Sequence, residues 1–180
     1  VSIHLYLKKE ISEIKSLIND FFKLLISLAK KNKDKLLPGY THFQVAMPSS
    51  FGLWFSGYAE SLIDYVTLFN AVQKIVDQNP LGSAAGFGSS FPINRETTTK
   101  ALDFGDLKYN VIAAQMSRGK AEKLISNAIA SLSATLAKMA YDICLYMGQD
   151  HNFISFPENL TTGSSIMPHK KNPDVFELIR

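Results

Sequence analysis

Three long segments of this chain repeat apolar residues in steps that alternate between three and four, the spacing of one face of an α-helix. No glycine or proline interrupts the first segment, residues 1–37. The second follows Pro48, and the third runs roughly from Asp106 to Met147. The alternation of every second residue that indicates a strand is absent over any useful length. We therefore predict an all-α protein, a bundle of long helices with no β-sheet.

The third segment is apolar around much of its circumference, with few polar residues between Ile125 and Tyr146. A helix of this kind is buried on several sides, and one chain of 180 residues offers too few neighbouring helices for that. We predict that the bundle is completed by oligomerisation. The chain also begins at Val1 inside a helical pattern, so we expect residues 1–180 to be the central helical-bundle domain of a longer chain.

Composition excludes several classes of protein. With 46% hydrophobic and 19% charged residues, the chain is too apolar to be disordered. Its net charge of +3 does not indicate a nucleic-acid partner. The only cysteine, Cys144, excludes a disulfide framework and a cysteine-rich zinc site, and the four histidines lack the paired spacing of metal ligands. No uninterrupted apolar stretch is long enough to cross a membrane, so we expect a cytoplasmic protein with no membrane partner.

Two connecting segments carry residues that could act chemically. Residues 37–50 contain Thr41 and His42; histidine exchanges protons near neutral pH, although a histidine that satisfies a helix end fits the same pattern. Residues 79–94 are rich in glycine and serine, so their amides could face an anion, or the segment could be a plain connector. Arg95 follows and could either bind a carboxylate or pair locally at a helix start.

The third connecting segment, residues 152–172, is the richest in function-capable groups. Its last part, Gly163–Asn172, carries two serines and two lysines, and then Asn172, Pro173 and Asp174 fit the start of a helix with Asn172 as the N-cap. A loop that ends at a helix N-terminus favours anions. A Ser-His-Asp triad is not indicated, because the Gly-x-Ser-x-Gly turn and its preceding strand are absent.

The same segment carries a family resemblance. Residues 163–172 read Gly-Ser-Ser-Ile-Met-Pro-His-Lys-Lys-Asn, which matches Gly-Ser-Ser-x-Met-Pro-x-Lys-x-Asn, the signature of the fumarase/aspartase superfamily. Residues 38–44, residues 80–83 and Arg95-Glu96 resemble, in the same order, the argininosuccinate lyases within that superfamily. Many relatives carry Gln at position 47 and Asp at position 119, where this chain has Met47 and Gly119.

The resemblance implies a fold and a reaction. Members are homotetramers whose long helices share a central bundle, and each active site is assembled from three subunits. They split argininosuccinate reversibly into arginine and fumarate by β-elimination, in arginine biosynthesis, and they need no metal or organic cofactor. The expected partners are thus a small-molecule substrate and further copies of the chain.

The resemblance also implies roles for single residues. Ser164 matches the general base that removes a proton next to a carboxylate. His42 matches the histidine that supports protonation of the leaving nitrogen, and Glu177 matches the carboxylate that pairs with this histidine. The residues that match or fit substrate contacts are Thr41, Ser165, Lys170, Asn172 and Arg95.

Two other functions stay open at this point. A non-catalytic structural protein on the same scaffold, as the lens crystallins of this superfamily are, would have the same helices. A sister lyase that acts on another succinyl amine would share both Thr41-His42 and the signature loop.

Overall fold

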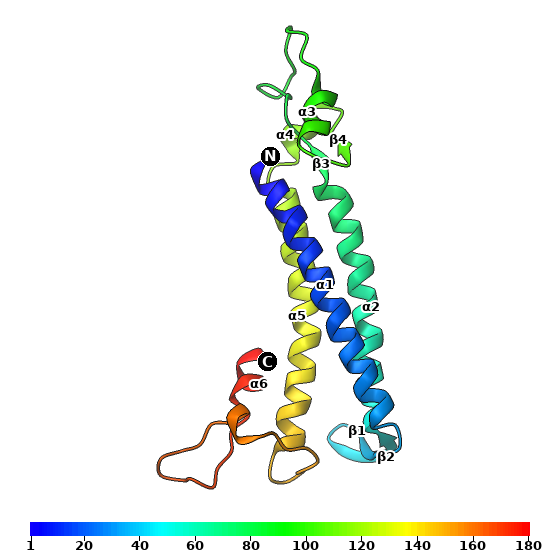
Figure 1. The fold of residues 1–180 in the computed structure, drawn as a ribbon, viewed down its shortest axis with the longest axis vertical. Helices are drawn as coiled ribbons and strands as arrows, with labels where there is room; N and C mark the ends of the chain where they lie inside the picture. Colours follow the sequence, from blue (N-terminus) through cyan, green and yellow to red (C-terminus); the bar gives the residue numbers. More distant parts are fainter. The chain divides into compact units, whose positions relative to one another are not determined.

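The computed structural model describes residues 1–180, and it is mainly helical, as predicted. Figure 1 traces the chain through its elements. The long helices are α1 (Ser2–Lys31), α2 (Phe51–Val76) and α5 (Lys120–Met147). The short elements are β1 (Leu36–Thr41), β2 (Gln44–Ser50), β3 (Gln78–Asn79), α3 (Arg95–Ala101), β4 (Asp106–Leu107), α4 (Val111–Met116), the 3-10 turn η1 (Glu158–Leu160) and α6 (Asp174–Ile179).

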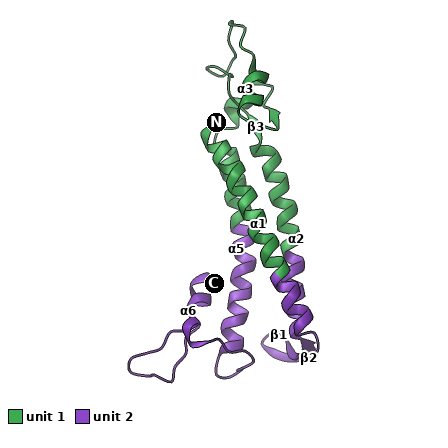
Figure 2. Cartoon of the chain, viewed as in Figure 1, with its two compact units in different colours: residues 1–23, 62–129 green, residues 24–61, 130–180 purple.

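The chain divides into two compact units, and each long helix contributes to both (Figure 2). Unit 1 comprises residues 1–23 and 62–129, and unit 2 comprises residues 24–61 and 130–180. Both cores are made mainly from the apolar faces of the long helices, and Leu37 of β1 joins the core of unit 2. The buried side chains of unit 1 include Ile11, Ile18, Leu62, Phe69, Val72, Val76 and Ile125, and those of unit 2 include Leu25, Leu37, Ala59, Met139 and Ile143. Each large apolar side chain buried in this way contributes about 1.5–3 kcal/mol.

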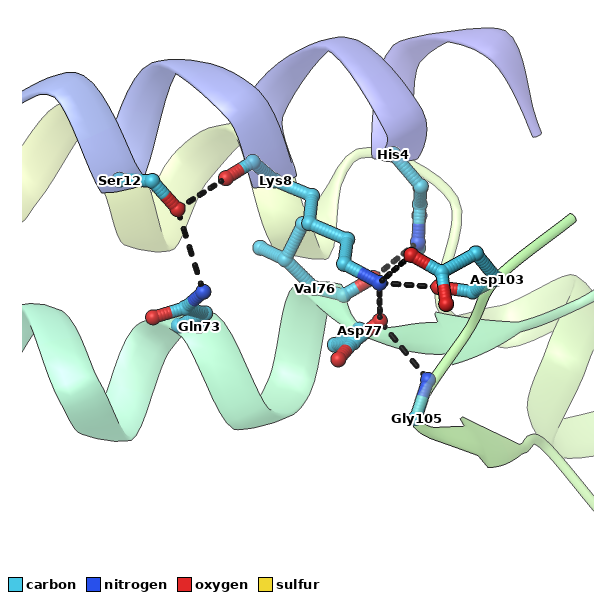
Figure 3. A network of polar contacts seen from close by, with 8 residues as sticks. All are labelled: His4, Lys8, Ser12, Gln73, Val76, Asp77, Asp103 and Gly105. Carbon is cyan, nitrogen blue, oxygen red and sulfur yellow. Dashed lines mark hydrogen bonds and ion pairs between the residues drawn. The ribbon is translucent and has the colours of Figure 1, made fainter.

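A polar network fastens the start of α1 to the end of α2 in unit 1 (Figure 3). The Lys8 ammonium lies 2.9 Å from an Asp77 carboxylate oxygen and 3.6 Å from the Asp103 carboxylate. Asp77 also accepts a hydrogen bond from the backbone amide of Gly105, at 2.9 Å. Burial lowers the pKa of Lys8, but the hydrogen bond and the charge of Asp77, with that of Asp103, outweigh burial and raise the pKa overall. Because Asp103 and Gly105 follow α3, the network holds that segment against the helix ends.

The structure corrects the prediction that no β-structure is present. β1 and β2 form an antiparallel hairpin in which Leu36 pairs with Ser50 and Thr41 with Gln44. The two residues between the strands, His42 and Phe43, have φ of 53° and 60°, as a type I′ turn requires. Asn-Gly or Asp-Gly is the usual signal for such a turn. Since His-Phe carries no such signal, the sequence pattern predicted a loop.

A second, smaller pairing was also missed. β3 and β4 form a two-residue parallel bridge in unit 1. Next to it, the buried amide of Asn79 donates to the hydroxyls of Thr98 and Thr99 and accepts from the amide of Leu81. Elements of two residues are too short to produce a recognisable pattern.

The predicted third helix is shorter than its pattern. A helix from Asp106 to Met147 was expected, but β4, α4 and α5 follow one another there, and residues 117–119 separate the two helices. Gly119 has a φ of +78°, a left-handed conformation that ends the preceding helical geometry and that glycine adopts without steric cost.

α5 is long and apolar enough to cross a membrane, judged on length and composition alone, and the core helix of a soluble bundle meets the same test. Only 22% of its most apolar window is buried within this chain. Complete burial of this helix, which its composition predicted, is therefore not achieved by a single copy.

Candidate active site

Thr41 and His42 lie at the turn of the β1–β2 hairpin, in unit 2. Both side chains are exposed. His42 adopts a positive φ of 53°, which is uncommon for a residue other than glycine. Its ring forms no hydrogen bond or ion pair within the chain, so it does not satisfy a helix end. The hairpin instead presents a free imidazole at its tip.

Aromatic contacts hold the hairpin. The ring of Tyr40, next to Thr41, meets the ring of His151 with centroids 5.6 Å apart. The series continues from His151 to Phe153, at 5.4 Å, and from Phe153 to Tyr146 of α5, at 5.7 Å. Such pairs contribute about 0.5–1.5 kcal/mol each beyond burial. The His42 turn is thereby anchored to the end of α5.

The signature loop, Gly163–Asn172, lies between η1 and α6 in unit 2. Its two ends are joined, because Thr162 and Asn172 exchange backbone hydrogen bonds of 3.1 and 2.8 Å. The tip of the loop is open to solvent; Ile166 is 88% exposed. Ser164 is half-buried, and its hydroxyl oxygen accepts a hydrogen bond of 3.4 Å from the amide of Ile166. No imidazole or carboxylate of this chain contacts that hydroxyl.

Two predicted ligands of the substrate carboxylate lie at the C-terminal side of the loop. Lys170 is exposed and its ammonium forms no ion pair within the chain, so a charged donor is available there. Asn172 is not the N-cap of α6, which corrects the prediction. Pro173 occupies that position, and the side-chain amide of Asn172 reaches the Thr162 hydroxyl at 3.4 Å instead. The backbone pairing with Thr162 fixes Asn172 before the helix begins. Ser165 is exposed on the loop.

Glu177 does not pair with His42 in this chain. It lies on α6, is exposed, and its carboxylate is 3.9 Å from the guanidinium of Arg180. That guanidinium also lies over the ring of Tyr141, 5.9 Å from its centroid. No hydrogen bond, ion pair or ring contact joins His42 or Thr41 to Glu177 or to the signature loop.

Arg95 belongs to unit 1 and binds main chain rather than a carboxylate. Its guanidinium donates to the carbonyl oxygens of Leu81, Lys108 and Tyr109, at 2.9, 2.8 and 2.9 Å. These bonds join the start of the Gly/Ser-rich segment to the segment before α4. The observed role of Arg95 is thus structural.

One polar contact of unit 2 was not predicted. The Asp142 carboxylate of α5 accepts hydrogen bonds from the indole of Trp54, at 2.9 Å, and from the hydroxyl of Tyr58, at 2.7 Å, both on α2. Burial raises the pKa of Tyr58 most, and the hydrogen bond and the charge of Asp142 raise it further. The only sequence signal was an acidic residue within an otherwise apolar stretch.

No group of three or more histidine, cysteine, aspartate or glutamate side chains lies together in a way that could hold a metal ion. The chain offers the exposed imidazole of His42 at the hairpin turn. The signature loop offers the Ser164 hydroxyl, the Lys170 ammonium and the Asn172 amide. This set can move protons and bind carboxylates.

A family model described as a lyase matches residues 1–180, the whole of this chain. The chain belongs to this lyase family. Among its relatives, an argininosuccinate lyase of Parabacteroides distasonis is 56% identical over all 180 residues. One of Phocaeicola vulgatus is 53% identical, and one of Stenotrophomonas maltophilia is 42% identical over the same length. The resemblance deduced from the motifs is confirmed.

The lyase chain described here spans 40% of the length of the first two relatives and 42% of the third. Solved structures share its fold at low identity. An EDDS lyase in complex with formate matches 98% of this chain and 35% of its own, with a TM-score of 0.93 and 24% identity. A fumarate lyase:delta crystallin from Brucella melitensis matches 98% of this chain and 40% of its own, with a TM-score of 0.84 and 20% identity. The predicted fold, a bundle of long helices, is confirmed.

Proposed function

We propose that the protein carrying this lyase chain splits argininosuccinate reversibly into arginine and fumarate. The observation that carries the proposal is the identity of 51–56% with argininosuccinate lyases over all 180 residues, a length that includes the whole signature loop. We further propose that residues 1–180 form the central domain of a longer cytoplasmic enzyme, because the matched relatives are about two and a half times as long.

The elimination needs two proton transfers, one on each side of the substrate. The Ser164 oxygen takes the proton from the carbon next to a carboxylate, and the electron pair of that C–H bond forms the double bond of fumarate as the C–N bond breaks. The departing nitrogen gains a proton with the support of His42. Glu177 raises the basicity of that imidazole in the assembled site.

The negative charge that develops on the substrate carboxylate needs donors in fixed positions. The unpaired ammonium of Lys170 and the side-chain amide of Asn172 are suitable, and Thr41 and Ser165 supply further polar contacts. A serine hydroxyl is a weak base in water, so positive charge and amides must stabilise its ionised form. We leave Arg95 out of this set, because carbonyl oxygens already occupy its guanidinium.

We propose that the site is assembled from more than one copy of the chain. Within one copy, His42 contacts neither Ser164 nor Glu177, and all three are partly or fully open to solvent. We propose a homotetramer in which neighbouring copies bring these groups together.

The assignment of the base is tested in the full-length enzyme by Ser164→Ala. Fumarate release, followed by its ultraviolet absorbance, should fall by about 10²–10⁴-fold, the usual contribution of a positioned acid or base. Ser27→Ala is the matched control, since Ser27 is exposed on α1, and it should retain full activity. Undiminished turnover in Ser164→Ala would remove Ser164 from this role.

His42→Asn tests the other side of the site. The change keeps a polar group at the hairpin turn, and Asn tolerates a positive φ, so the hairpin should persist while the proton carrier is lost. We expect turnover to fall by about 10²–10⁴-fold. A wild-type enzyme that releases no fumarate from argininosuccinate would instead favour a sister lyase or a crystallin-like protein, and a screen of other succinyl amines would separate those two.

A further inference from the structure

The side chains at the neck of the signature loop form a compact polar cluster. The Thr162 hydroxyl donates a hydrogen bond to the Asp174 carboxylate, and its oxygen lies 3.4 Å from the amide nitrogen of Asn172. The backbones of Thr162 and Asn172 are paired in both directions at the same place. One hydroxyl therefore connects the incoming strand of the loop with the residue that ends the loop and with the first turn of α6.

The other contacts around the neck involve residues that lie farther from the serine in the chain than Thr162 does. Lys171 and Glu158 form an ion pair of 3.2 Å, but their side chains are 52% and 86% exposed, and exposed pairs contribute little. The rings of Phe156 and Phe176 pack with centroids 4.9 Å apart and hold the segment before η1 against α6. Neither contact reaches the residues next to Ser164.

Inside the loop, few contacts hold the chain. The amide of Lys170 bonds to the carbonyl of Met167 at 3.0 Å, and the amide of Ile166 reaches the Ser164 hydroxyl at 3.4 Å. A Cβ added to Gly163 would meet only the carbonyl of Lys170, at 3.7 Å. With so little internal support, the placement of Ser164 depends on the neck, which lies two residues away.

We propose that Thr162 and Asp174 are positioning residues for Ser164, and that their hydroxyl–carboxylate contact holds the neck of the loop in the geometry that proton removal requires. The proposal rests on the proposed function, since it concerns the same serine. Thr162 does not itself touch the reacting atoms. It acts by fixing the chain direction on both sides of Gly163, and it holds the side chain of Asn172 at the same time.

The test compares Thr162→Val with Thr162→Ser in the full-length enzyme. Valine keeps the shape of threonine but removes the hydroxyl, whereas serine keeps the hydroxyl. Since a misplacement of about 1 Å can cost about 10²-fold in rate, we expect kcat of the valine variant to fall by about 10–100-fold, with a smaller change in KM. The serine variant should stay within about threefold of wild type.

A second readout does not depend on catalysis. A loop with a loosened neck adapts more readily to a protease, so trypsin cleavage after the exposed Lys170 and Lys171 should be faster in Thr162→Val than in the wild type and in Thr162→Ser. If Thr162→Val does not fold, Asp174→Ala removes the same contact from the other side and should show the same two effects.

Equal kcat and equal cleavage in the hydroxyl-free variant and the wild type would overturn the proposal. Absence of fumarate release from the wild type would contradict the proposed function alone, because the cleavage rates would still test the neck.

Discussion

At the scale of single residues, Asp142 shows how a side chain that looks misplaced in the sequence can become a stabilising contact. Its carboxylate accepts two hydrogen bonds, from Trp54 and Tyr58 of α2. Hydrogen bonds to a charged acceptor are the stronger kind. Together they select the rotation of α2 about its own axis where it faces α5 in unit 2.

Tyr58→Phe should therefore reduce stability. The change removes one hydrogen bond to a carboxylate and keeps the ring, so we expect the free energy of unfolding to fall by about 1–3 kcal/mol, measured by urea denaturation. Tyr6→Phe is the control, because Tyr6 is 61% exposed on α1 and its change should stay within about 0.5 kcal/mol. Equal stabilities of the two variants would show that the Asp142 contact contributes nothing.

The same tyrosine predicts a pH effect. The folded state raises the pKa of Tyr58 above its usual value of 10.0, so it favours the protonated phenol. Below pH 10 both folded and unfolded states hold this proton. Above it the unfolded chain loses the proton first, and folding stability declines as the pH rises. Between about pH 9 and pH 11, one unit to either side of the ordinary phenol pKa of about 10, the free energy of unfolding should drop less in Tyr58→Phe than in the wild type. An identical drop would contradict the assignment.

At the scale of elements, the glycines of α2 differ in what surrounds them. A Cβ added to Gly52 would lie 2.6 Å from the Cα of Lys33 and 3.0 Å from the carbonyl oxygen of Ala29. A Cβ added to Gly57 would meet nothing within 4 Å. Gly52 therefore permits a close approach of α2 to the end of α1, whereas Gly57 has open space beside it.

This difference makes a matched pair of variants. Gly52→Ala forces two backbones apart and should lower the free energy of unfolding by about 1–3 kcal/mol. Gly57→Ala should raise it by about 0.5–1 kcal/mol, because alanine favours the helix interior. Thermal unfolding of both variants gives the comparison, and a Gly52→Ala variant as stable as Gly57→Ala would contradict the close approach.

The starts of α2 and α6 differ in the reach of the contacts that fix them. Ser50 caps α2 by accepting a hydrogen bond from the amide of Leu53 at 3.1 Å, a local interaction over three residues. Asn172 fits the same local rule, but its backbone pairs with Thr162 instead. A partner ten residues away outweighed the local preference, and the sequence pattern contained no sign of it.

At the scale of the whole molecule, the long helices leave large apolar side chains uncovered. Leu17 of α1 is 63% exposed, Ile63 of α2 52% and Ile129 of α5 41%. Apolar side chains that join into a large exposed patch mark interaction sites, and we expect these helix faces to be covered by another copy. This agrees with the proposed homotetramer, in which a second copy would bring His42 to Ser164.

Ile129→Glu tests the assembly. A charge placed on an apolar helix face that becomes buried between copies is costly, so the variant should dissociate to smaller species, seen by light scattering coupled to size-exclusion chromatography, and should lose activity with it. Lys31→Glu changes charge at the exposed end of α1 and should keep the assembly of the wild type. If Ile129→Glu has the same mass as the wild type, α5 does not contribute to the interface at this position.

The sequence by itself determined the helical class, the family and the loop that carries Ser164, because helix periodicity and the ten-residue signature are properties of neighbouring positions. Only the tertiary structure decided that His42 lies at the tip of a hairpin, that Arg95 binds carbonyl oxygens, and that Thr162 joins Asn172 and Asp174. These outcomes depend on pairings between segments distant in the chain or on a turn without its usual residues. In each case the free energy of a contact formed on folding outweighed the preference of the local sequence.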